Sequence, residues 1–85
     1  MDVNGPVSTT ARSLRLLSYI DIHGPTPIGP ICRDLELSRS TAHQHINTLL
    51  AAGLIDRRGG DYVLGFHLYH LGERARRQVT GYPEV

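Results

Sequence analysis

The chain has 85 residues, of which 40% are hydrophobic and 20% are charged, and its formal net charge is +1. These values predict one small domain that buries only about 60% of the surface its unfolded form exposes, too little for a deep catalytic cleft. No apolar run approaches the ~18 residues of a membrane span, and the first residues lack the basic start and apolar segment of a secretory signal. We therefore expect a cytoplasmic protein with no membrane partner.

The chain begins with a segment that has no helical or strand periodicity. Residues 1–8 contain Gly5 and Pro6, and we expect a disordered lead there. A helix is predicted at about 9–22, where apolar residues recur on the core face: Leu14, Leu17 and Ile20. Hydroxyl groups at its start offer N-cap oxygens: Ser8, Thr9 and Thr10. The helix is expected to end at Gly24, because glycine adopts the left-handed cap and the following proline cannot continue the helix.

Residues 26–37 leave room only for a short helix, because three of them restrict the backbone: Pro27, Gly29 and Pro30. Pro30 fits in the first turn, where its missing N–H costs little. Ile31 and Leu35 are expected to point inward. Cys32 lies beside them as the only cysteine of the chain, so it cannot form an internal disulfide and is most simply a small buried hydrophobic residue.

The stretch SRSTAHQHINTLLAAGLI, residues 38–55, predicts an amphipathic helix at 38–52 with Ser38 as its N-cap. One face is small or apolar and is expected to pack on the core: Ala42, Ile46, Leu49 and Gly53. The opposite face is polar and carries no acid: Arg39, Ser40, His43, Gln44 and Asn47. We expect His45 to pack partly into the core, whereas His43 is a hydrogen-bond donor on the polar face.

Two short strands are predicted at 54–57 and 62–65. They are joined across Arg58-Gly59-Gly60-Asp61, in which the two glycines are expected to supply the positive φ values of a tight hairpin. A further helix starts at Phe66 and ends by Thr80-Gly81. Its apolar side chains form one stripe: Leu68, Leu71 and Ala75.

Three helices followed by a two-stranded ribbon are the element order of a winged helix-turn-helix. The predicted fold is mainly α with a small β-ribbon: the winged helix-turn-helix occupies 9–65, and a linker helix and tail occupy 66–85. A third helix that is apolar behind and hydrogen-bonding in front suits the major groove of double-stranded DNA. The alternative is a winged helix that binds another protein and no DNA, which acids on the polar face would have favoured.

The same residues resemble the DNA-binding domain of IclR-type transcriptional regulators. The matching segments are RSLRLLSYI at 12–20, HGPTPIGPICRDLELSRSTAHQHINTLLAAGLI at 23–55, and DYVLG with LYHLG within 61–72. The resemblance implies operator binding, with the helix at 38–52 in the major groove and the wing at 54–65 on the DNA backbone. The residues expected to bind DNA are Ser38, Arg39, Ser40, Thr41, His43, Gln44, Asn47, Arg57 and Arg58.

In that family the domain binds DNA as a dimer, and a linker helix joins it to a separate domain that binds a small effector. We accordingly expect a homodimer on a pseudo-palindromic operator. The first helix supplies more apolar surface than one of its faces needs, in Leu14, Leu16, Leu17 and Tyr19. No effector domain follows Val85, and VTGYPEV at 79–85 resembles a linker cut midway. We expect an excised DNA-binding domain, with a natural short form as the alternative.

The sequence offers little for catalysis or for metal binding. The acids are scattered, and Gly59-Gly60 lacks the lysine and the strand-helix context of a phosphate-binding loop, so no enzyme is expected. His67 and His70 lie three residues apart on the last helix and could share a cation, but nothing in the sequence places a third ligand. No cofactor and no metal are expected.

Overall fold

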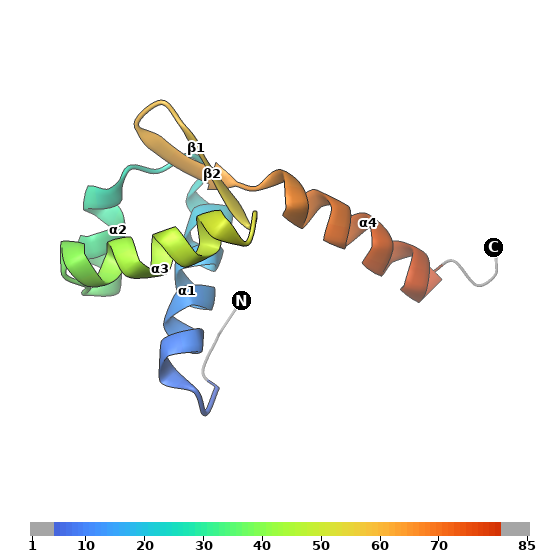
Figure 1. Ribbon diagram of the computed structural model, residues 1–85, viewed down its shortest axis with the longest axis horizontal. Helices are drawn as coiled ribbons and strands as arrows, with labels where there is room; N and C mark the ends of the chain where they lie inside the picture. Colours follow the sequence, from blue (N-terminus) through green and yellow to red (C-terminus); the bar gives the residue numbers. More distant parts are fainter. Residues whose placement is uncertain (1–4, 81–85) are drawn as a thin grey trace.

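The computed structural model describes residues 5–80, which form a winged helix-turn-helix followed by one further helix (Figure 1). This is the predicted fold. The elements in chain order are α1 (Ser8–His23), α2 (Ile28–Leu35), α3 (Arg39–Ala51), β1 (Ile55–Arg58), β2 (Asp61–Leu64) and α4 (Phe66–Thr80). None of the helices in the described part of the chain is both long enough and apolar enough to cross a bilayer.

Helix α1 begins at Ser8, one residue earlier than predicted. The predicted hydroxyl caps are wrong, because Ser8 and the two threonines after it lie inside the first turn and Val7 occupies the N-cap without a side-chain hydrogen bond. This turn is exposed, so water can satisfy its free N–H groups. The expected disordered lead at 1–8 is therefore wrong at Ser8, and residues 1–4 lie outside the described residues.

The end of α1 is as predicted. Gly24 has a φ of 76°, and its backbone N–H donates to the carbonyl oxygen of Ile20 at 2.9 Å. A residue with a β-carbon would be strained at this positive φ, although the ψ of −159° differs from that of the predicted left-handed cap. The turn sends the chain back toward α2.

Most of the apolar residues of α1 that were predicted to be surplus surface pack on the core. Leu16 and Leu17 lie in the core, because α1 packs against α2, α3 and β2 and so buries a wide arc of its surface. Leu14 is half-buried. Tyr19 is half-buried against the same core, and its hydroxyl donates to Asp34 at 2.5 Å. The reason given for dimerisation through α1 is therefore wrong.

Helices α2 and α3 close the core from the other side. Ile31, Ala42 and Ile46 have no solvent exposure, and Leu35 and Cys32 are half-buried against them, as predicted. Full burial of one aliphatic side chain of this size stabilises a fold by about 1.5–3 kcal/mol. The helical spacing of these residues thus fixes which face of α3 points inward, and by exclusion which face points to solvent.

Each strand of the wing lies one residue closer to the loop than predicted, β1 at Ile55–Arg58 and β2 at Asp61–Leu64. The register of the wing pairs Arg58 with Asp61, so that Gly59 and Gly60 alone form the loop. Gly59 has a φ of 63°, whereas Gly60 is not among the residues with positive φ. Positive φ at the first loop position only is the pattern of a type II′ turn. The expectation of two positive φ values was wrong because this turn type needs one.

A backbone pairing that the sequence did not predict connects the wing to the α1–α2 turn. Thr26 and Tyr62 form an antiparallel bridge with hydrogen bonds of 3.1 and 2.8 Å between their backbone groups. Both residues are buried. The bridge holds β2 against the helical body, so the position of the wing is fixed by contacts at its base.

Helix α4 leaves this body and extends away from it (Figure 1). Of its predicted stripe, only Leu68 packs on the core, and Leu71 and Ala75 are exposed. The junction with the body is tight at Gly65, where an added β-carbon would lie 2.2 Å from the carbonyl oxygen of Gly53. The helix extends to Thr80, the last of the described residues, and Gly81 of the predicted end lies outside them.

Candidate nucleic-acid interface

The start of α3 is fixed by a side-chain cap at Ser38, as predicted. The Ser38 Oγ accepts from the backbone N–H of Thr41 at 3.1 Å and donates to the Thr41 hydroxyl at 3.0 Å. A cap of this kind stabilises a helix by about 1 kcal/mol. Both hydroxyls thus have a structural role in addition to the DNA contact that was predicted for them.

Helix α3 presents the predicted polar face to solvent. Its exposed residues include all five predicted members: Arg39, Ser40, His43, Gln44 and Asn47. Thr48 lies beside them, exposed, with its hydroxyl donating to the carbonyl oxygen of Gln44 at 3.2 Å. Sequence reasoning did not include Thr48, although its spacing of four residues from Gln44 was a usable signal.

The exposed face of α3 has the chemistry needed to approach DNA. Arg39 is the only charged residue of α3, and no acid occurs between Glu36 and Asp56. No carboxylate of α3 can therefore repel phosphate. The amides of Gln44 and Asn47 each offer a donor and an acceptor, the combination that pairs bidentately with the edge of adenine in the major groove.

His45 does not belong to this exposed face. It is half-buried, and its Nδ1 lies 2.6 Å from the Oγ of Ser13 in α1. The contact links α3 to α1 near the C-terminal half of α3. His45 therefore has the partly packed position that was predicted for it, and His43 is the exposed histidine of the pair.

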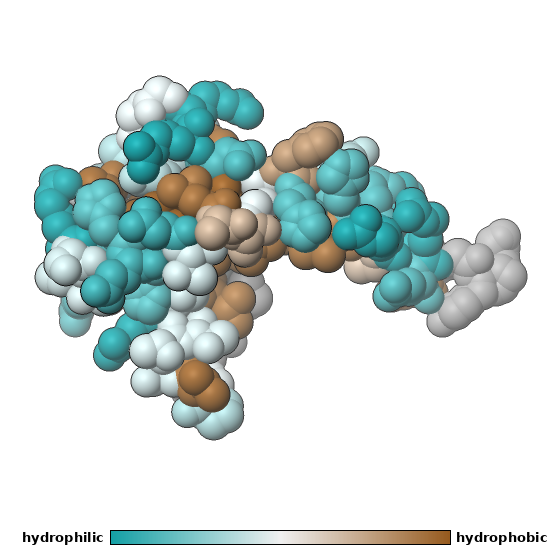
Figure 2. All heavy atoms as spheres, viewed as in Figure 1, coloured by the Kyte–Doolittle hydropathy of each residue, from teal (hydrophilic) through white to brown (hydrophobic). Residues whose placement is uncertain are grey.

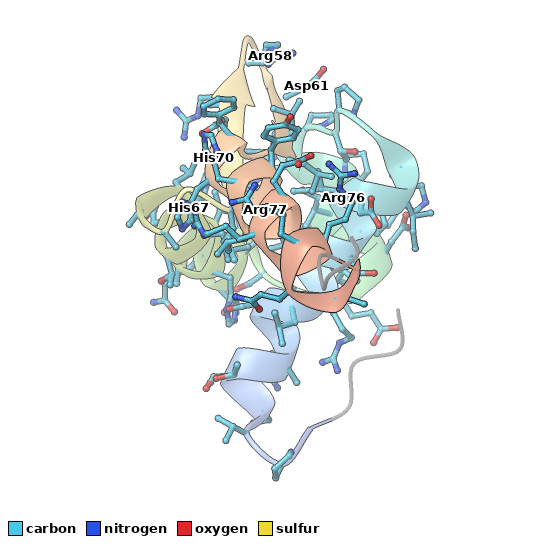
Figure 3. The ribbon with its side chains drawn as sticks, turned by 90° about the vertical axis from the view of Figure 1, so that its right-hand side faces the viewer. Arg58, Asp61, His67, His70, Arg76 and Arg77 are labelled. Atoms are coloured by element: carbon cyan, nitrogen blue, oxygen red, sulfur yellow. The ribbon has the colours of Figure 1, made fainter. Side chains whose placement is uncertain are left out.

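The two wing arginines are exposed but do not lie together. They occupy successive positions of β1, and successive side chains of a strand point to opposite faces. The guanidinium of Arg57 donates to the Tyr62 hydroxyl at 3.4 Å and lies 5.4 Å from the centre of that ring. Arg58 stands at the wing tip opposite Asp61 (Figure 3). Each arginine thus reaches a different side of the ribbon.

A polar hollow at the start of α3 adds two basic residues that the sequence analysis did not assign. Its volume is about 370 Å³. Arg12 and Arg15 of α1 line it together with Ser38 and Thr41 of α3, and Glu36 contributes a carboxylate. Two arginines three residues apart on the polar face of α1 were visible in the sequence. Their position beside α3 depends on the packing of α1 against the α2–α3 turn, which the sequence does not display.

The remaining candidates form no second site within residues 5–80. No group of three or more histidine, cysteine or acidic side chains is placed to hold a metal ion in this part of the chain. His67 and His70 are both exposed on α4. Cys32 lies half-buried against the core.

Comparison with known proteins agrees with this geometry. The sequence model of a helix-turn-helix domain family matches residues 13–58, which are more than half of the 85 residues and span most of α1, the helix-turn-helix and β1. No curated protein and no solved structure matches the chain. Domains of this fold typically bind DNA and are not enzymes. The chain belongs to the helix-turn-helix domain family.

Proposed function

We propose that this domain binds double-stranded DNA with sequence specificity as part of a transcriptional regulator. The exposed face of α3 enters the major groove, and the wing contacts the backbone. The observation that carries this proposal is the acid-free polar face of α3, held outward by the burial of Ala42, Ile46 and Leu49 on the other side of the helix. A helix with these two faces can pack on its own domain with one face while the other face contacts base edges.

The proposed kind of regulator is IclR-like. This rests on the resemblance of the segments at 12–20, 23–55 and 61–72, which form α1, the helix-turn-helix, and β2 with the first half of α4. In such a regulator α4 is the linker to an effector-binding domain. The exposed position of α4 is compatible with that role.

We also propose that the protein dimerises, and the residues that support this proposal lie on α4 and not on α1. Four large apolar residues of α4 are exposed: Phe66, Tyr69, Leu71 and Val79. A twofold protein reads a pseudo-palindrome whose half-sites are about 10 bp apart or a multiple of that spacing. Bound sites without an inverted repeat would contradict the dimer. A monomer in free solution is compatible with it, since two copies can meet on DNA.

The proposed roles divide the interface into readers and positioners. Gln44 pairs with adenine, and Arg39 pairs with guanine or with a phosphate. Ser38, Ser40, Thr41, His43 and Asn47 donate to bases or phosphates along the same face. Arg57 and Arg58 bind phosphates, which positions the domain without reading sequence.

The experiment that tests this division begins with sequencing of the genomic DNA fragments that the protein retains, which returns the site. Affinity is then measured for that site and for a scrambled duplex at several salt concentrations. Gln44→Ala should lower discrimination at one base position by about 1–3 kcal/mol. Gln78→Ala, the same chemical change on α4, should leave discrimination intact.

The double variant Arg57→Ala/Arg58→Ala should weaken binding to both duplexes alike. Each lost phosphate contact flattens the slope of log K against log[salt] by about 0.9. If the wing variant removes discrimination and Gln44→Ala does not, the wing is the reader and α3 is not. If neither variant changes binding, the protein-binding winged helix replaces the DNA-binding domain as the explanation.

A further inference from the structure

Helix α4 carries a row of basic side chains on one side, and we define this basic stripe as His67, His70, Arg74 and Arg77. Their spacings of three, four and three residues place them within one arc of the helix. All four are exposed. The apolar residues Leu68, Leu71 and Ala75 occupy the neighbouring arc of α4, and of these three only Leu68 packs on the core, so most of the basic stripe does not border a buried face.

The packing of the protein does not explain the two arginines of the basic stripe, whereas the His70 ring lies against the rings of Phe66 and Tyr69. Leu68 is the residue of α4 that packs against the core, and Arg74 and Arg77 lie six and nine residues farther along the helix. Among the described residues, neither arginine takes part in an ion pair. Arg76 differs, because its guanidinium contacts Glu73 at 2.7 Å. That hydrogen bond and the charge of Arg76 lower the pKa of Glu73, and the charge of Arg77 adds a smaller effect in the same direction.

The basic stripe begins where α3 ends. A β-carbon on Gly53 would lie 2.8 Å from the β-carbon of His67, so the first member of the stripe sits at the C-terminal end of α3. Figure 3, in which α4 points toward the viewer, shows His67 and His70 on the side of α4 where α3 lies and Arg76 on the opposite side. Figure 2 shows hydrophilic side chains over α3 and along α4 on the same face of the molecule.

We propose that the basic stripe binds the phosphate backbone of the DNA that flanks the base pairs contacted by α3. A helix of 15 residues is about 22 Å long, which corresponds to roughly six base pairs along a duplex. Arg74 and Arg77 supply two charges for phosphates, and the histidines supply N–H donors. Continuity with the α3 face and the sign of the charge make the duplex the partner that fits. This inference rests on the proposed DNA binding of α3.

The test compares two neighbouring arginines in the whole 85-residue chain on a generic duplex of about 30 bp, which is longer than α3 and α4 together require. Arg77→Ala and Arg76→Ala change the net charge equally, but only Arg77 belongs to the basic stripe. The slope of log K against log[salt] should flatten by about 0.9 for Arg77→Ala and by about twice that for Arg74→Ala/Arg77→Ala. It should not change for Arg76→Ala.

The slopes of the two single variants decide whether the basic stripe contacts DNA. Equal slopes for Arg77→Ala and Arg76→Ala would overturn the basic stripe as a DNA contact and leave a net-charge effect only. In that case loss of binding by Arg57→Ala/Arg58→Ala would show that the proposed function itself holds. If the unaltered protein binds no duplex even at low salt, both proposals are overturned. All these side chains are exposed, so a loss of folding is not expected, and circular dichroism of each variant checks this.

Discussion

The winged helix-turn-helix and α4 differ in where their apolar side chains lie. In residues 8–65 most apolar side chains converge on one core, where Leu16, Ile31 and Ile46 have no exposure at all, and Ile22 and Leu64 are the large apolar residues left exposed. In α4 the large apolar side chains other than Leu68 are exposed, and Phe66 and Val79 are more than half exposed. The apolar residues of the winged helix-turn-helix are explained by their packing against one another in the core. The exposed charges and apolar residues of α4 lack such contacts, and we propose that DNA and a second copy of the chain supply them.

The largest expected effect contrasts a core residue with an apolar residue of α4. Ile46→Ala should lower the free energy of unfolding by about 2–5 kcal/mol, because it leaves a cavity between α1 and α3. Leu71→Ala should change it by less than about 0.5 kcal/mol, because Leu71 is 41% exposed. Urea denaturation measures both. Similar losses for the two variants would mean that α4 is part of the folded body.

The next largest effect is expected at Gly65, at the junction between the winged helix-turn-helix and α4. Gly65→Ala should destabilise the protein by about 1–3 kcal/mol, since the new β-carbon would meet backbone atoms of Gly53 and Leu54. Gly72→Ala is the control within α4, where nothing lies within 4 Å, and it should stabilise the helix by up to about 1 kcal/mol. Thermal or urea unfolding measures the stability of both variants. A neutral Gly65→Ala would contradict the tight junction described here.

A smaller effect is expected at the entry to α3. Ser38→Ala removes the cap of the Thr41 N–H and should cost about 1 kcal/mol. Ser40→Ala, two residues later on the exposed face, removes a hydroxyl without a capping role and should leave stability within about 0.5 kcal/mol. Both should weaken DNA binding if the exposed face is the interface. A stable Ser38→Ala variant would show that the cap is dispensable.

The smallest effect concerns the contact between α1 and α2. The hydrogen bond from Tyr19, with the adjacent Arg33, lowers the pKa of Asp34 from its usual value of 3.8. A depressed carboxyl pKa stabilises the fold above the usual value, and this contribution is lost as the pH falls through the lowered value. Tyr19→Phe should therefore be less stable than the unaltered protein at pH 7, by an amount that shrinks toward pH 3. A difference that does not change with pH would contradict this cause.

Local signals in the sequence were enough for the elements and for the exposed face of α3. The cap at Ser38, the glycine end of α1 and the buried spacing of Ala42, Ile46 and Leu49 all depend on residues within a few positions of one another. The polar face of α3 was predictable for the same reason, because the face opposite the buried residues is exposed.

The features that were missed depend on residues far apart in the chain. The bridge between Thr26 and Tyr62, the burial of Leu16 and the hollow that joins Arg12 to the start of α3 all arise when α1 packs against several elements at once. Helical spacing assigns one face to a helix, but the width of the buried arc depends on how many partners surround it. The loop of the wing is two residues shorter than predicted, because the strands pair up to Arg58 and Asp61 and the two glycines form a turn with one positive φ value.

The most direct test of the central claim, that α3 is the DNA-binding helix, is an NMR titration of the isotopically labelled chain with duplex DNA at low salt. The predicted result is that amide shifts change in α3 from Arg39 to Thr48 and in the wing at Arg57 and Arg58, and that added salt reverses the changes. Shift changes along α4 as well are expected from the basic stripe. A spectrum that DNA leaves unchanged, or changes that avoid α3, would contradict the claim.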